Sequence, residues 1–581
     1  MSEAWLRERV ATALTGVLGD GVPDAETVNR ALAPSKKAGQ GDYAFPCFVL
    51  AKELRQAPPA IAADVLAALQ TRIDEAPELL KAEQAGPYVN VYVDPTARAR
   101  VTLGAIAEAG AAYGTSDAGQ GRAVCVDFSS PNIAKPFGIG HLRSTVIGSA
   151  ICNLYRACGW NPVGINHLGD WGKQFGMLMV ALTERGGEER LDATDAPMAE
   201  LYKLYVEIHA DDDPTIEATA KGWFRRLEQG DAEARRLWQR CVDVSLVEFS
   251  AMYERLGVTD NLTHWWGESH YEGEPMDRVL AEAREREVLA ESDGAQVVFL
   301  DDVDETLPPC LLVKADGATL YATRDLASAI YRQEETDAAR LVYVVGAGQR
   351  VHFQQIFGVL GKLGYGWSEA CSHVPFGLIL GMSTRKGTMV MLDDVLTQAV
   401  SKVREVIEDR DYPDADKDVI AEQVGVGAII FADLSSQRVK DWEFDWEQLL
   451  NFHGRTGPYL QYAYVRMGSV LDKFEAVFGG KPAADEAQWS ALTDPEAQDL
   501  LRRLGTFPEV VARACEEHEP SVVSRYLLDL AESNNRFYSQ RRVVDEADPG
   551  TSAARAVLTD GVRTVLASGL SLLGVALPDR M

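Results

Sequence analysis

The stretch "AVCVDFSSPNIAKPFGIGHLRSTVIG", Ala123 to Gly148, decides the fold of this chain. Its opening run, Ala123 to Phe128, is mostly apolar and β-branched, which predicts a short buried strand. Beyond His141, apolar side chains recur at helical spacing, at Leu142, Val146, Ile147, Ala150, Ile151 and Leu154. The stretch therefore predicts a strand, a glycine-containing loop and a helix in direct succession.

The loop between the predicted strand and helix has the composition of an anion-binding loop. Glycines allow a phosphate to come close, and backbone N–H groups at a helix N-terminus attract negative charge. The alternative is a tight turn with structural glycines. Because short glycine motifs are weak signals, the loop alone favours neither interpretation.

Length and composition place the chain among ordinary globular proteins. Its 581 residues predict about three or four domains. The apolar fraction of 46% and charged fraction of 25% are typical of such proteins. No apolar run approaches the length of a membrane span, and the first residues contain acids where a signal peptide has an apolar core.

The cysteines and the net charge narrow the possible functions. The 8 cysteines are scattered without a CxxC pair, which indicates reduced thiols in the cytoplasm and neither a disulfide framework nor a zinc knuckle. The formal net charge of −30 excludes a generally basic nucleic-acid binder. A local basic surface within an acidic protein remains compatible with that charge.

The domain organisation follows from changes in pattern along the chain. Residues 1–110 combine a helical pattern, "AADVLAALQTRI", with an alternating strand, Tyr88 to Asp94, and predict a small α+β domain. A linker rich in small residues, Glu108 to Arg122, follows. From 120 to 395, strands alternate with helices, which predicts a doubly wound parallel sheet with its ligand at the carboxyl ends of the strands.

Further strands of this sheet are predicted at Asn161–Asn166, Arg340–Gly346 and Val374–Leu380. A charged helical insertion is expected at about 190–260, with its charges on a solvated face. The pattern then becomes helical. It predicts a connecting region over 396–455 and a helical bundle over 456–581. The expected fold is thus α/β: a Rossmann-type domain between a small α+β domain and an all-helical C-terminal bundle.

The opening stretch resembles the signature loop of class I aminoacyl-tRNA synthetases, in particular that of arginyl-tRNA synthetases. "GMSTRKG", Gly381 to Gly387, is similar to the second signature of that family. Other blocks that look like family motifs are "NHLGDWGKQFG", "YATRDLA", "GRTGPYLQYAYVR" and the C-terminal "VLASGLSLLGVALPDRM". These blocks occur in family order, and the resemblance covers essentially the whole chain.

The resemblance implies a cytoplasmic enzyme that joins L-arginine to tRNA(Arg). Arginine and ATP would form arginyl-adenylate with release of pyrophosphate, and the arginyl group would then move to the terminal ribose. The resemblance also implies Mg²⁺ with the ATP, no zinc, a monomer without an obligate protein partner or membrane, and activation that needs bound tRNA. Catalysis would rest on positioning and charge stabilisation rather than on a covalent enzyme intermediate.

The family motifs assign the ATP-binding and catalytic residues. The ATP-binding loop would comprise Pro131, Asn132, Ile133, Ala134, Lys135, Pro136, Phe137, Gly138, Ile139, Gly140 and His141. The catalytic residues would be Lys135, His141, Ser383, Arg385 and Lys386. His141 begins the helix after the loop, where its imidazole can hydrogen-bond a phosphate or ribose oxygen. By itself it would be interpreted as a structural histidine, and the second motif as a solvated basic turn.

Arginine as substrate requires acids and planar hydrogen-bond partners for its guanidinium. The family pocket, carried over by position, comprises Asp127, Asn132, Tyr321, Asp325 and Gln349. Tyr321 and Asp325 would share one face of a helix, and Asp127 ends the first strand. Asp127 is shorter than the glutamate often found there, so its contact with substrate could be direct or through water. The alternative for Asp325 is a surface acid, and for Gln349 a polar loop residue.

Two positions depart from the family pattern. Gly138 replaces the first histidine of the first signature, and Gly381 replaces the first lysine of the second. These losses keep open a second interpretation, a catalytically weakened paralogue that retains tRNA binding. The retained pocket residues speak against that interpretation. A different class I synthetase is disfavoured, because two acids are placed for a guanidinium.

Contacts with tRNA are expected in both terminal domains. The C-terminal part resembles the anticodon-binding bundle of the family, and the N-terminal part its tRNA-elbow-binding domain. The candidate residues are Asn90, Tyr459, Tyr538 and Met581, and Phe537 lies in the same C-terminal blocks. Any one of these aromatic residues is more often part of a core than an RNA contact. Arginine pairs at 225–226, 235–236 and 541–542 could meet phosphates, although solvated helix faces explain the first two pairs at least as well.

Overall fold

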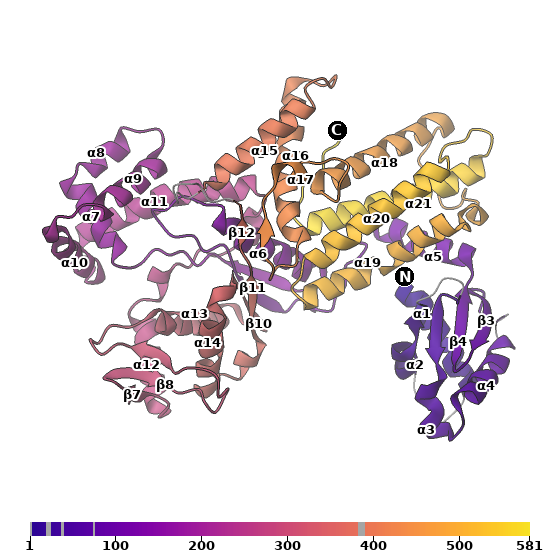
Figure 1. Ribbon diagram of the computed structural model, residues 1–581, viewed down its shortest axis with the longest axis horizontal. Helices are drawn as coiled ribbons and strands as arrows, with labels where there is room; N and C mark the ends of the chain where they lie inside the picture. Colours follow the sequence, from indigo (N-terminus) through magenta and orange to yellow (C-terminus); the bar gives the residue numbers. More distant parts are fainter. Residues whose placement is uncertain (1–2, 19–24, 36–39, 72, 74–75, 382–389) are drawn as a thin grey trace. The chain divides into compact units, whose positions relative to one another are not determined.

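The computed structural model describes residues 3–18, 25–35, 40–71, 73, 76–381 and 390–581 (Figure 1). The chain divides into two compact units, which are described separately. The first unit comprises residues 1–115, 460–513 and 525–569. The second comprises residues 116–459, 514–524 and 570–581.

A parallel four-stranded sheet is the frame of the second unit. Its strands are β5 (Ala123–Asp127), β6 (Asn161–Ile165), β10 (Arg340–Gly346) and β11 (Cys371–Phe376), in the spatial order β11-β10-β5-β6. Because β6 lies on one side of β5 while β10 and β11 lie on the other, the strand order reverses between β5 and β10. Doubly wound sheets bind ligands outside the carboxyl ends of their strands at such a point. The predicted fold class is confirmed.

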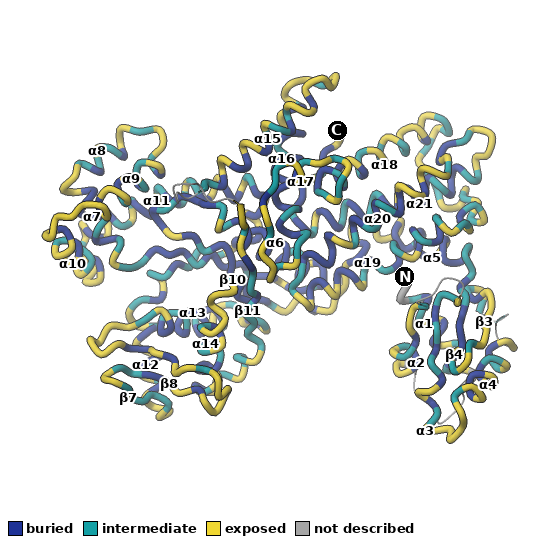
Figure 2. Tube along the Cα trace, in the orientation of Figure 1, coloured by how far each residue is buried: buried dark blue, intermediate teal, exposed yellow. Residues whose placement is uncertain are grey.

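The central strand β5 is buried on both faces, as its continuous apolar run predicts. Val124 and Val126 are fully buried, and Cys125 pairs with Leu341 of β10. Figure 2 shows helix α6 and most of β10 as buried tube, while β11 is mostly of intermediate burial. Helices on both faces exclude water from such a sheet, which is why its strands lack the polar alternation of a half-exposed sheet.

Helix α6 (Gly140–Ala157) follows the opening loop and packs closely against the end of β5. A Cβ atom on Gly148 would lie only 2.2 Å from Cγ of Phe128. Glycine is therefore required at position 148 for the helix to approach the sheet at this distance. This contact sets how closely α6 approaches the end of β5.

The helical insertion leaves the sheet after β6 and returns before β10. Its elements are α7 (Gln174–Glu184), α8 (Gly187–Asp192), α9 (Pro197–His209), α10 (Pro214–Glu228), α11 (Ala232–Arg255), η4 (Thr259–Asn261), η5 (Glu268–Tyr271) and α12 (Glu274–Glu285). An antiparallel sheet follows, made of β7 (Ala290–Ser292), β8 (Ala295–Val298) and β9 (Cys310–Val313). Helices α13 (Tyr321–Thr336) and α14 (Arg350–Lys362) flank β10, and η6 (Ala347–Gln349) and η7 (Gly366–Ala370) flank α14.

The strand predicted at 374–380 is divided in the structure. β11 ends at Phe376, and Ile379–Leu380 form a separate strand, β12, which pairs in parallel with β13 (Trp442–Glu443). Gly377 lies against Asp441, whose carboxylate accepts a hydrogen bond from the Leu378 N–H at 2.6 Å. This local contact turns the chain away from the parallel sheet, an interaction that the hydrophobic pattern could not reveal.

The connecting region after β12 is helical, as predicted from its pattern. It contains α15 (Leu392–Val406), α16 (Asp414–Ser435) and α17 (Trp446–Leu449). A buried ion pair joins it to α6, because Arg143 lies 2.8 Å from Asp433 of α16. Trp442 donates a hydrogen bond to the same carboxylate at 2.8 Å. Burial raises the pKa of Asp433, and the guanidinium of Arg143 opposes that rise.

The first unit begins with an antiparallel sheet of order β1-β2-β4-β3. Its elements are α1 (Glu3–Leu18), α2 (Ala25–Ala31), β1 (Ala33–Pro34), β2 (Tyr43–Pro46), η1 (Cys47–Leu50), α3 (Ala51–Leu54), α4 (Pro58–Gln70), β3 (Leu79–Ala85), β4 (Tyr88–Val93), α5 (Pro95–Ala109) and η3 (Gly110–Ala112). Leu14, Val28, Phe45 and Leu69 belong to one buried core beneath this sheet. The N-terminal part is therefore the α+β fold that its mixed pattern predicts.

Four long helices complete the described elements, and most of their residues belong to the first unit. They are α18 (Gly457–Phe478), α19 (Pro495–Glu516), α20 (Ser521–Gln540) and α21 (Pro549–Leu572), with η8 (Trp489–Leu492) before α19. Arg98 of α5 ties the two parts of the first unit together, since it donates to Gln498 at 2.9 Å and pairs with Asp42 at 2.8 Å. Among the described helices, none has both the length and the apolar character needed to cross a membrane.

Candidate active site

The loop after β5 has a strained backbone. Ser129, Ser130 and Ala134 have positive φ angles of 70°, 54° and 60°. Side chains other than glycine rarely adopt this left-handed region, and such residues persist only where their surroundings hold them. Strain of this kind clusters at functional sites, so the loop is a candidate site on backbone geometry alone.

Side chains of the insertion and of α6 hold the loop in this conformation. The Ser129 N–H donates to Ser144 Oγ at 2.9 Å, and the Ala134 N–H to Ser245 Oγ at 2.9 Å. The Phe137 N–H donates to the Glu248 carboxylate at 3.0 Å. The N–H groups of Ile133, Lys135, Gly138 and Ile139 also donate to acceptors within the protein.

This bonding corrects one prediction made from the sequence. The loop was expected to aim its backbone N–H groups at a phosphate, yet most of those donors already have protein acceptors. The glycines and prolines of the loop shape it, and buried Phe137 fastens it. An anion here would have to be held chiefly by side chains, and the loop offers exposed Asn132 and half-buried Lys135.

His141 lies at the start of α6 with a defined tautomer. Its Nδ1 accepts a hydrogen bond from the Gly138 N–H at 3.2 Å, so the ring proton of the neutral imidazole is on Nε2. Burial lowers the pKa of His141 below its usual value, and nearby Lys135 adds to that effect. A neutral imidazole with a fixed Nε2–H is a hydrogen-bond donor for a phosphate or ribose oxygen.

Lys135 extends from the loop toward the insertion. Its ammonium lies 5.5 Å from the centre of the Tyr205 ring on α9, within the range of a cation–π contact. The flexible side chain of lysine can leave such a contact at small cost, because exposed cation–π pairs contribute only about 0.5–1 kcal/mol. Lys135 is thus held beside the loop and remains within reach of a ligand over it.

The described chain after the second predicted signature pairs directly with the first. The Ile139 N–H donates to the Val390 carbonyl at 3.0 Å, and the Leu392 N–H donates to the Phe137 carbonyl at 3.0 Å. The chain that follows that signature is therefore anchored beside the loop. Ser383, Arg385 and Lys386, the predicted catalytic residues of the second signature, lie outside the described residues.

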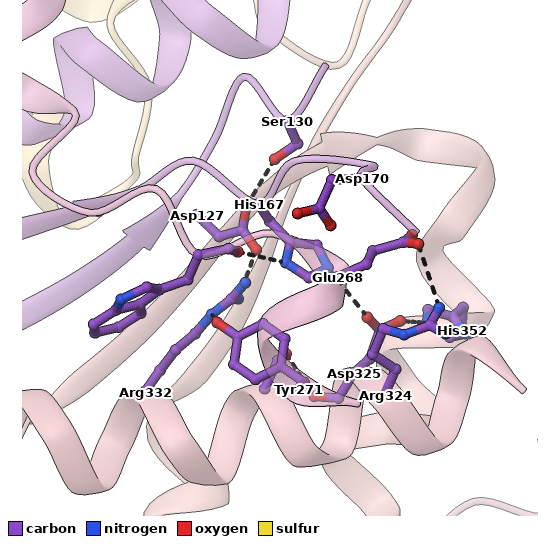
Figure 3. A network of polar contacts seen from close by, with 12 residues as sticks. Asp127, Ser130, His167, Asp170, Glu268, Tyr271, Arg324, Asp325, Arg332 and His352 are labelled. Atoms are coloured by element: carbon purple, nitrogen blue, oxygen red, sulfur yellow. Dashed lines mark hydrogen bonds and ion pairs between the residues drawn. The ribbon is translucent and has the colours of Figure 1, made fainter. Parts of the chain in front are cut away.

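A network of charged side chains lies beside the carboxyl ends of β5 and β10 (Figure 3). Arg332 of α13 pairs with Asp127 at 2.6 Å, and both side chains are buried. Tyr271 accepts a hydrogen bond from Arg332 at 3.2 Å, and Ser130 donates to Asp127 at 3.1 Å. The carboxylate of Asp127 is therefore already neutralised by an arginine of the protein itself.

Asp325 presents the more available carboxylate. It lies on α13, with its carboxylate 2.6 Å from Nε2 of His352 on α14 and 3.9 Å from His167. Its side chain is 26% exposed, so a ligand can reach it. Tyr321, one turn earlier on the same helix, is 67% exposed, and Gln349 is exposed just before α14. The packing of α13 against α14 thus brings these three predicted pocket residues to one region.

The network contains acids that the sequence did not single out. Glu268 lies 3.4 Å from Arg324, and Arg324 also pairs with Glu272. Burial raises the pKa of Glu268 to about 7, and the charges of Asp325 and Asp170 act in the same direction. Partly buried acids with raised pKa values cluster at functional sites.

Asp170 shows how this corner is built. It accepts hydrogen bonds from the Ser269 N–H at 2.8 Å and from the Ser269 hydroxyl at 2.6 Å. A Cβ atom on Gly267 would lie 2.4 Å from the Asp170 carboxylate, so glycine is required there. The "WGES" segment is therefore fixed against "GDWG", and this pairing turns Glu268 toward Asp325. In the sequence, the signal for this arrangement was Gly267 directly before Glu268.

The first unit contains two of the residues predicted to contact tRNA. Asn90 on β4 is only 6% exposed, because residues 41–42 cover that part of the strand. Little of its side chain is therefore available for a contact with tRNA, and that contact stays a prediction. Tyr538 is 37% exposed, and its ring lies 4.4 Å from the Arg466 guanidinium. This pair presents an aromatic face beside a cation.

The second unit contains the other two. Tyr459 is half-buried in the first turn of α18. Met581 is 8% exposed, and its carbonyl accepts a hydrogen bond from Tyr412 at 3.4 Å. The chain terminus is therefore held against the connecting region. Among the described residues, no group of three or more potential ligands is placed to hold a metal ion.

Comparison with known proteins agrees with this geometry. Residues 104–446 match the model for tRNA synthetases class I (R), catalytic domain, and residues 460–581 match the DALR anticodon binding domain. Residues 5–93 match the arginyl tRNA synthetase N terminal domain. The parallel sheet, its signature loop and these matches define a class I aminoacyl-tRNA synthetase, a class that uses ATP.

Similar proteins narrow the class. The chain is 44% identical to an arginine–tRNA ligase of Exiguobacterium sp. over 99% of both chains, and 41% identical to one of Clostridium botulinum over 96% of this chain and 97% of the relative. It matches the structure of Thermus thermophilus arginyl-tRNA synthetase with a TM-score of 0.78, 26% identity and 99% coverage of both chains. The chain belongs to the arginyl-tRNA synthetase family.

Proposed function

We propose that this chain is an active arginine–tRNA ligase that acts through the residues described above. The carboxylate of L-arginine would attack the α-phosphorus of ATP, forming arginyl-adenylate and releasing pyrophosphate. A hydroxyl of the terminal ribose of tRNA(Arg) would then attack the arginyl carbonyl, releasing AMP. One observation carries this proposal: acidic side chains gather around Asp325. This group of acids lies beside the carboxyl ends of β5 and β10 and close to the signature loop.

The guanidinium of the substrate is proposed to bind between Asp325 and Glu268. His352 fixes the Asp325 carboxylate from the far side at 2.6 Å, which orients it for a planar cation. Tyr321 and Gln349 would supply neutral hydrogen bonds, and Asn132 would meet the α-amino or carboxylate end. Asp127 is proposed to have no direct ion pair with the substrate guanidinium, because Arg332 already neutralises its carboxylate.

The phosphates of ATP are proposed to meet side chains rather than the loop backbone. His141 would donate from Nε2, and Lys135 would bring a full charge to the α-phosphate. Ser383, Arg385 and Lys386 are proposed to complete this contact from the second signature. ATP would enter as its Mg²⁺ complex, and no zinc site is proposed.

Binding of tRNA is proposed to involve both terminal domains. The proposed boundaries are 1–110 for an elbow-binding domain, 120–395 for the catalytic domain, 396–455 for the connecting region and 456–581 for an anticodon-binding domain. Tyr538 with Arg466 and the half-buried Tyr459 are the aromatic contacts favoured, with base stacking as the interaction. Met581 is retained as a candidate through its backbone. We propose a cytoplasmic location, consistent with 8 free thiols, and no obligate protein partner.

Arginine binding should depend on pH through Glu268. Because its pKa is raised to about 7, its carboxylate gains a proton and loses its charge as the pH falls through that value. The KM for arginine should therefore rise about tenfold between pH 8 and pH 6, when ATP and tRNA are saturating. In Glu268→Gln the KM should be higher and nearly independent of pH over this range. Equal pH profiles in both proteins would remove Glu268 from the pocket.

ATP–pyrophosphate exchange tests the proposed function as a whole. With arginine, ATP and Mg²⁺, exchange should be near background without tRNA and should appear when tRNA(Arg) is added, because family resemblance implies activation on the tRNA complex. Lysine in place of arginine should give no exchange. Exchange at full rate without tRNA would contradict the proposed order of binding.

A weakened paralogue remains the second candidate, supported only by Gly138 and Gly381. It predicts normal tRNA binding with no exchange under any of these conditions. The preserved acid network around Asp325 favours the active enzyme, since a protein that only binds tRNA has no use for a guanidinium pocket.

A further inference from the structure

The pocket proposed for the substrate guanidinium already contains a guanidinium of the protein. Arg324 lies on α13, directly before Asp325. Its Nε donates a hydrogen bond to the Glu272 carboxylate at 2.9 Å, and its Nη1 donates to Oε2 of Glu268 at 3.4 Å (Figure 3). The side chain of Arg324 is only 13% exposed, so water and salt screen these ion pairs weakly. Neither the ATP site nor the proposed contacts of arginine use this residue.

The two acids contact Arg324 in different ways. Glu272 accepts hydrogen bonds from both Nε and Nη2, and therefore anchors the guanidinium. Glu268 contacts Arg324 through Oε2 alone. Among the residues that the structure describes, none donates a hydrogen bond to Oε1 of Glu268. Arg324 thus holds this carboxylate by one oxygen and leaves the other for a ligand.

Glu268 needs a cation beside it because other acids surround it. Asp325 of α13, Asp170 of the loop after β6 and Glu272 all disfavour its charge. Burial is the largest effect in the same direction, and it raises the pKa of Glu268 to about 7. The charge of Arg324 opposes these effects.

Two histidines and a further acid complete this corner. His352 lies 2.6 Å and His167 lies 3.9 Å from the carboxylate of Asp325. Burial raises the pKa of Glu228, at the end of α10, and the charge of Glu272 adds to that rise. These three groups contact or face the flanking acids, so a change in their own protonation reaches the pocket only indirectly.

We propose that Arg324 is a positioning residue for arginine binding, which holds the Glu268 carboxylate beside Asp325 in the charged form that a guanidinium requires. The inference rests on the proposed function and adds to it a residue that does not touch the reacting atoms. Arginine suits this role because its guanidinium stays charged and binds carboxylates in a fixed planar geometry. A lysine ammonium would supply the charge without that geometry.

The internal and the substrate guanidinium can bind the same carboxylate. A carboxylate has two oxygens with about four lone-pair sites, and Arg324 uses one oxygen of Glu268. The substrate would then meet an acid that is already oriented, so less side-chain order has to be imposed when arginine binds. Arg324 therefore acts on the affinity for arginine rather than on the chemical step.

The pH dependence of the KM for arginine in Arg324→Gln tests the proposal. Aminoacylation rates are measured for the full-length chain with saturating ATP and tRNA(Arg). Without the cation, the pH midpoint below which the KM rises should move up by about one unit, because a nearby opposite charge favours the ionised carboxylate. The KM should therefore be about fivefold above wild type at pH 7 and close to wild type at pH 8.5, with little change in kcat.

Further variants separate this role from a structural one. Arg324→Lys keeps the charge but loses the planar contact, so its profile should lie between those of the wild type and Arg324→Gln. In a Glu268→Gln protein, Arg324→Gln should have no additional effect on the KM, because the titrating carboxylate is gone. Arg278→Gln is the matched control, since Arg278 also pairs with two acids, Glu282 and Glu334, and should keep the wild-type profile.

The proposal is overturned if Arg324→Gln keeps the wild-type KM at every pH, or if its KM rises by the same factor at pH 7 and pH 8.5, which would indicate a general defect. It is also overturned if the KM falls, since Arg324 would then compete with the substrate for Glu268. If Arg324→Gln does not fold, Arg324→Lys decides: a midpoint at higher pH supports the proposal, and an unchanged midpoint overturns it.

Failure of this inference is distinguishable from failure of the proposed function. Charging of tRNA by the wild type reports on the function, and the pH profile of Glu268→Gln reports on the pocket. Both would stand unchanged if Arg324 alone proved to have no role in arginine binding.

Discussion

Replacing Lys135 with alanine should slow adenylate formation by about two to three decades, with little change in the KM for arginine. Gly138 has no side chain to donate a hydrogen bond, and most backbone donors of the loop already have protein acceptors. Lys135 is the one lysine or arginine side chain between Ser130 and His141, so it is the cation that the described loop can offer to the phosphate. Loss of one donor aimed at charge that develops in the transition state costs about 2.7–4 kcal/mol.

Single-turnover adenylation with saturating tRNA measures this effect. Val206→Ala on the facing helix is the control, since it leaves both the lysine and Tyr205 in place. A near-normal rate in Lys135→Ala would contradict the assignment. Gly138→His should change the rate by much less, because Lys135 already offsets the negative charge that develops on the α-phosphate. A hundredfold gain in that variant would mean instead that the site is damaged.

Asp325→Asn should raise the KM for arginine by about one to two decades while leaving the KM for ATP nearly unchanged. The substitution keeps the shape of the side chain but removes its charge. It thereby weakens a charge-assisted hydrogen bond to the guanidinium worth about 1.5–3 kcal/mol. His352, which lies 2.6 Å from this carboxylate, retains an acceptor in the amide oxygen, so the variant should remain folded.

Initial rates of exchange over a range of arginine concentrations measure the effect. Glu335→Gln, which changes an exposed acid on the same helix, is the matched control and should leave the KM for arginine unchanged. If Asp325→Asn charged tRNA at the normal rate and with the normal KM, the pocket would lie elsewhere.

The parallel sheet was predictable because its central strand β5 is buried on both faces. The residues of β5 form a continuous apolar run without alternating polar positions, which is typical of a buried parallel strand. The helix after the loop has a clear apolar face. The placement of Asp325 on the same helix as Tyr321 was likewise predictable from their spacing of four residues. Local pattern was sufficient for both the sheet and this helix, while the role of Asp325 in the pocket stays a prediction.

The parts that the sequence missed depend on contacts between distant residues. Glu268 lies in an acidic segment that is typical of a solvated surface, and only its packing against Asp170 and Arg324 buries it. The loop N–H groups lost their predicted role because Ser245 and Glu248 of the insertion, more than a hundred residues away, accept their hydrogen bonds. Neither partner follows from spacing within the loop.

Asp127 shows both what local pattern predicts and what it misses. Its position at the end of β5 was predicted, but its partner Arg332 was not, because Arg332 belongs to a helix about two hundred residues later. The resulting ion pair is buried, and it holds Tyr271 and Ser130 in place through their hydrogen bonds to Arg332 and Asp127. An internal guanidinium thus occupies a carboxylate that the motif alone would offer to the substrate.

Aminoacylation of tRNA(Arg) with radiolabelled arginine tests the central claim most directly. The account predicts that the purified full-length chain, supplied with ATP and Mg²⁺, charges tRNA with arginine and not with lysine, and that Asp325→Asn requires much more arginine to do so. Tight binding of tRNA with no arginine transferred at any concentration would contradict the account and would identify the chain as a tRNA-binding paralogue.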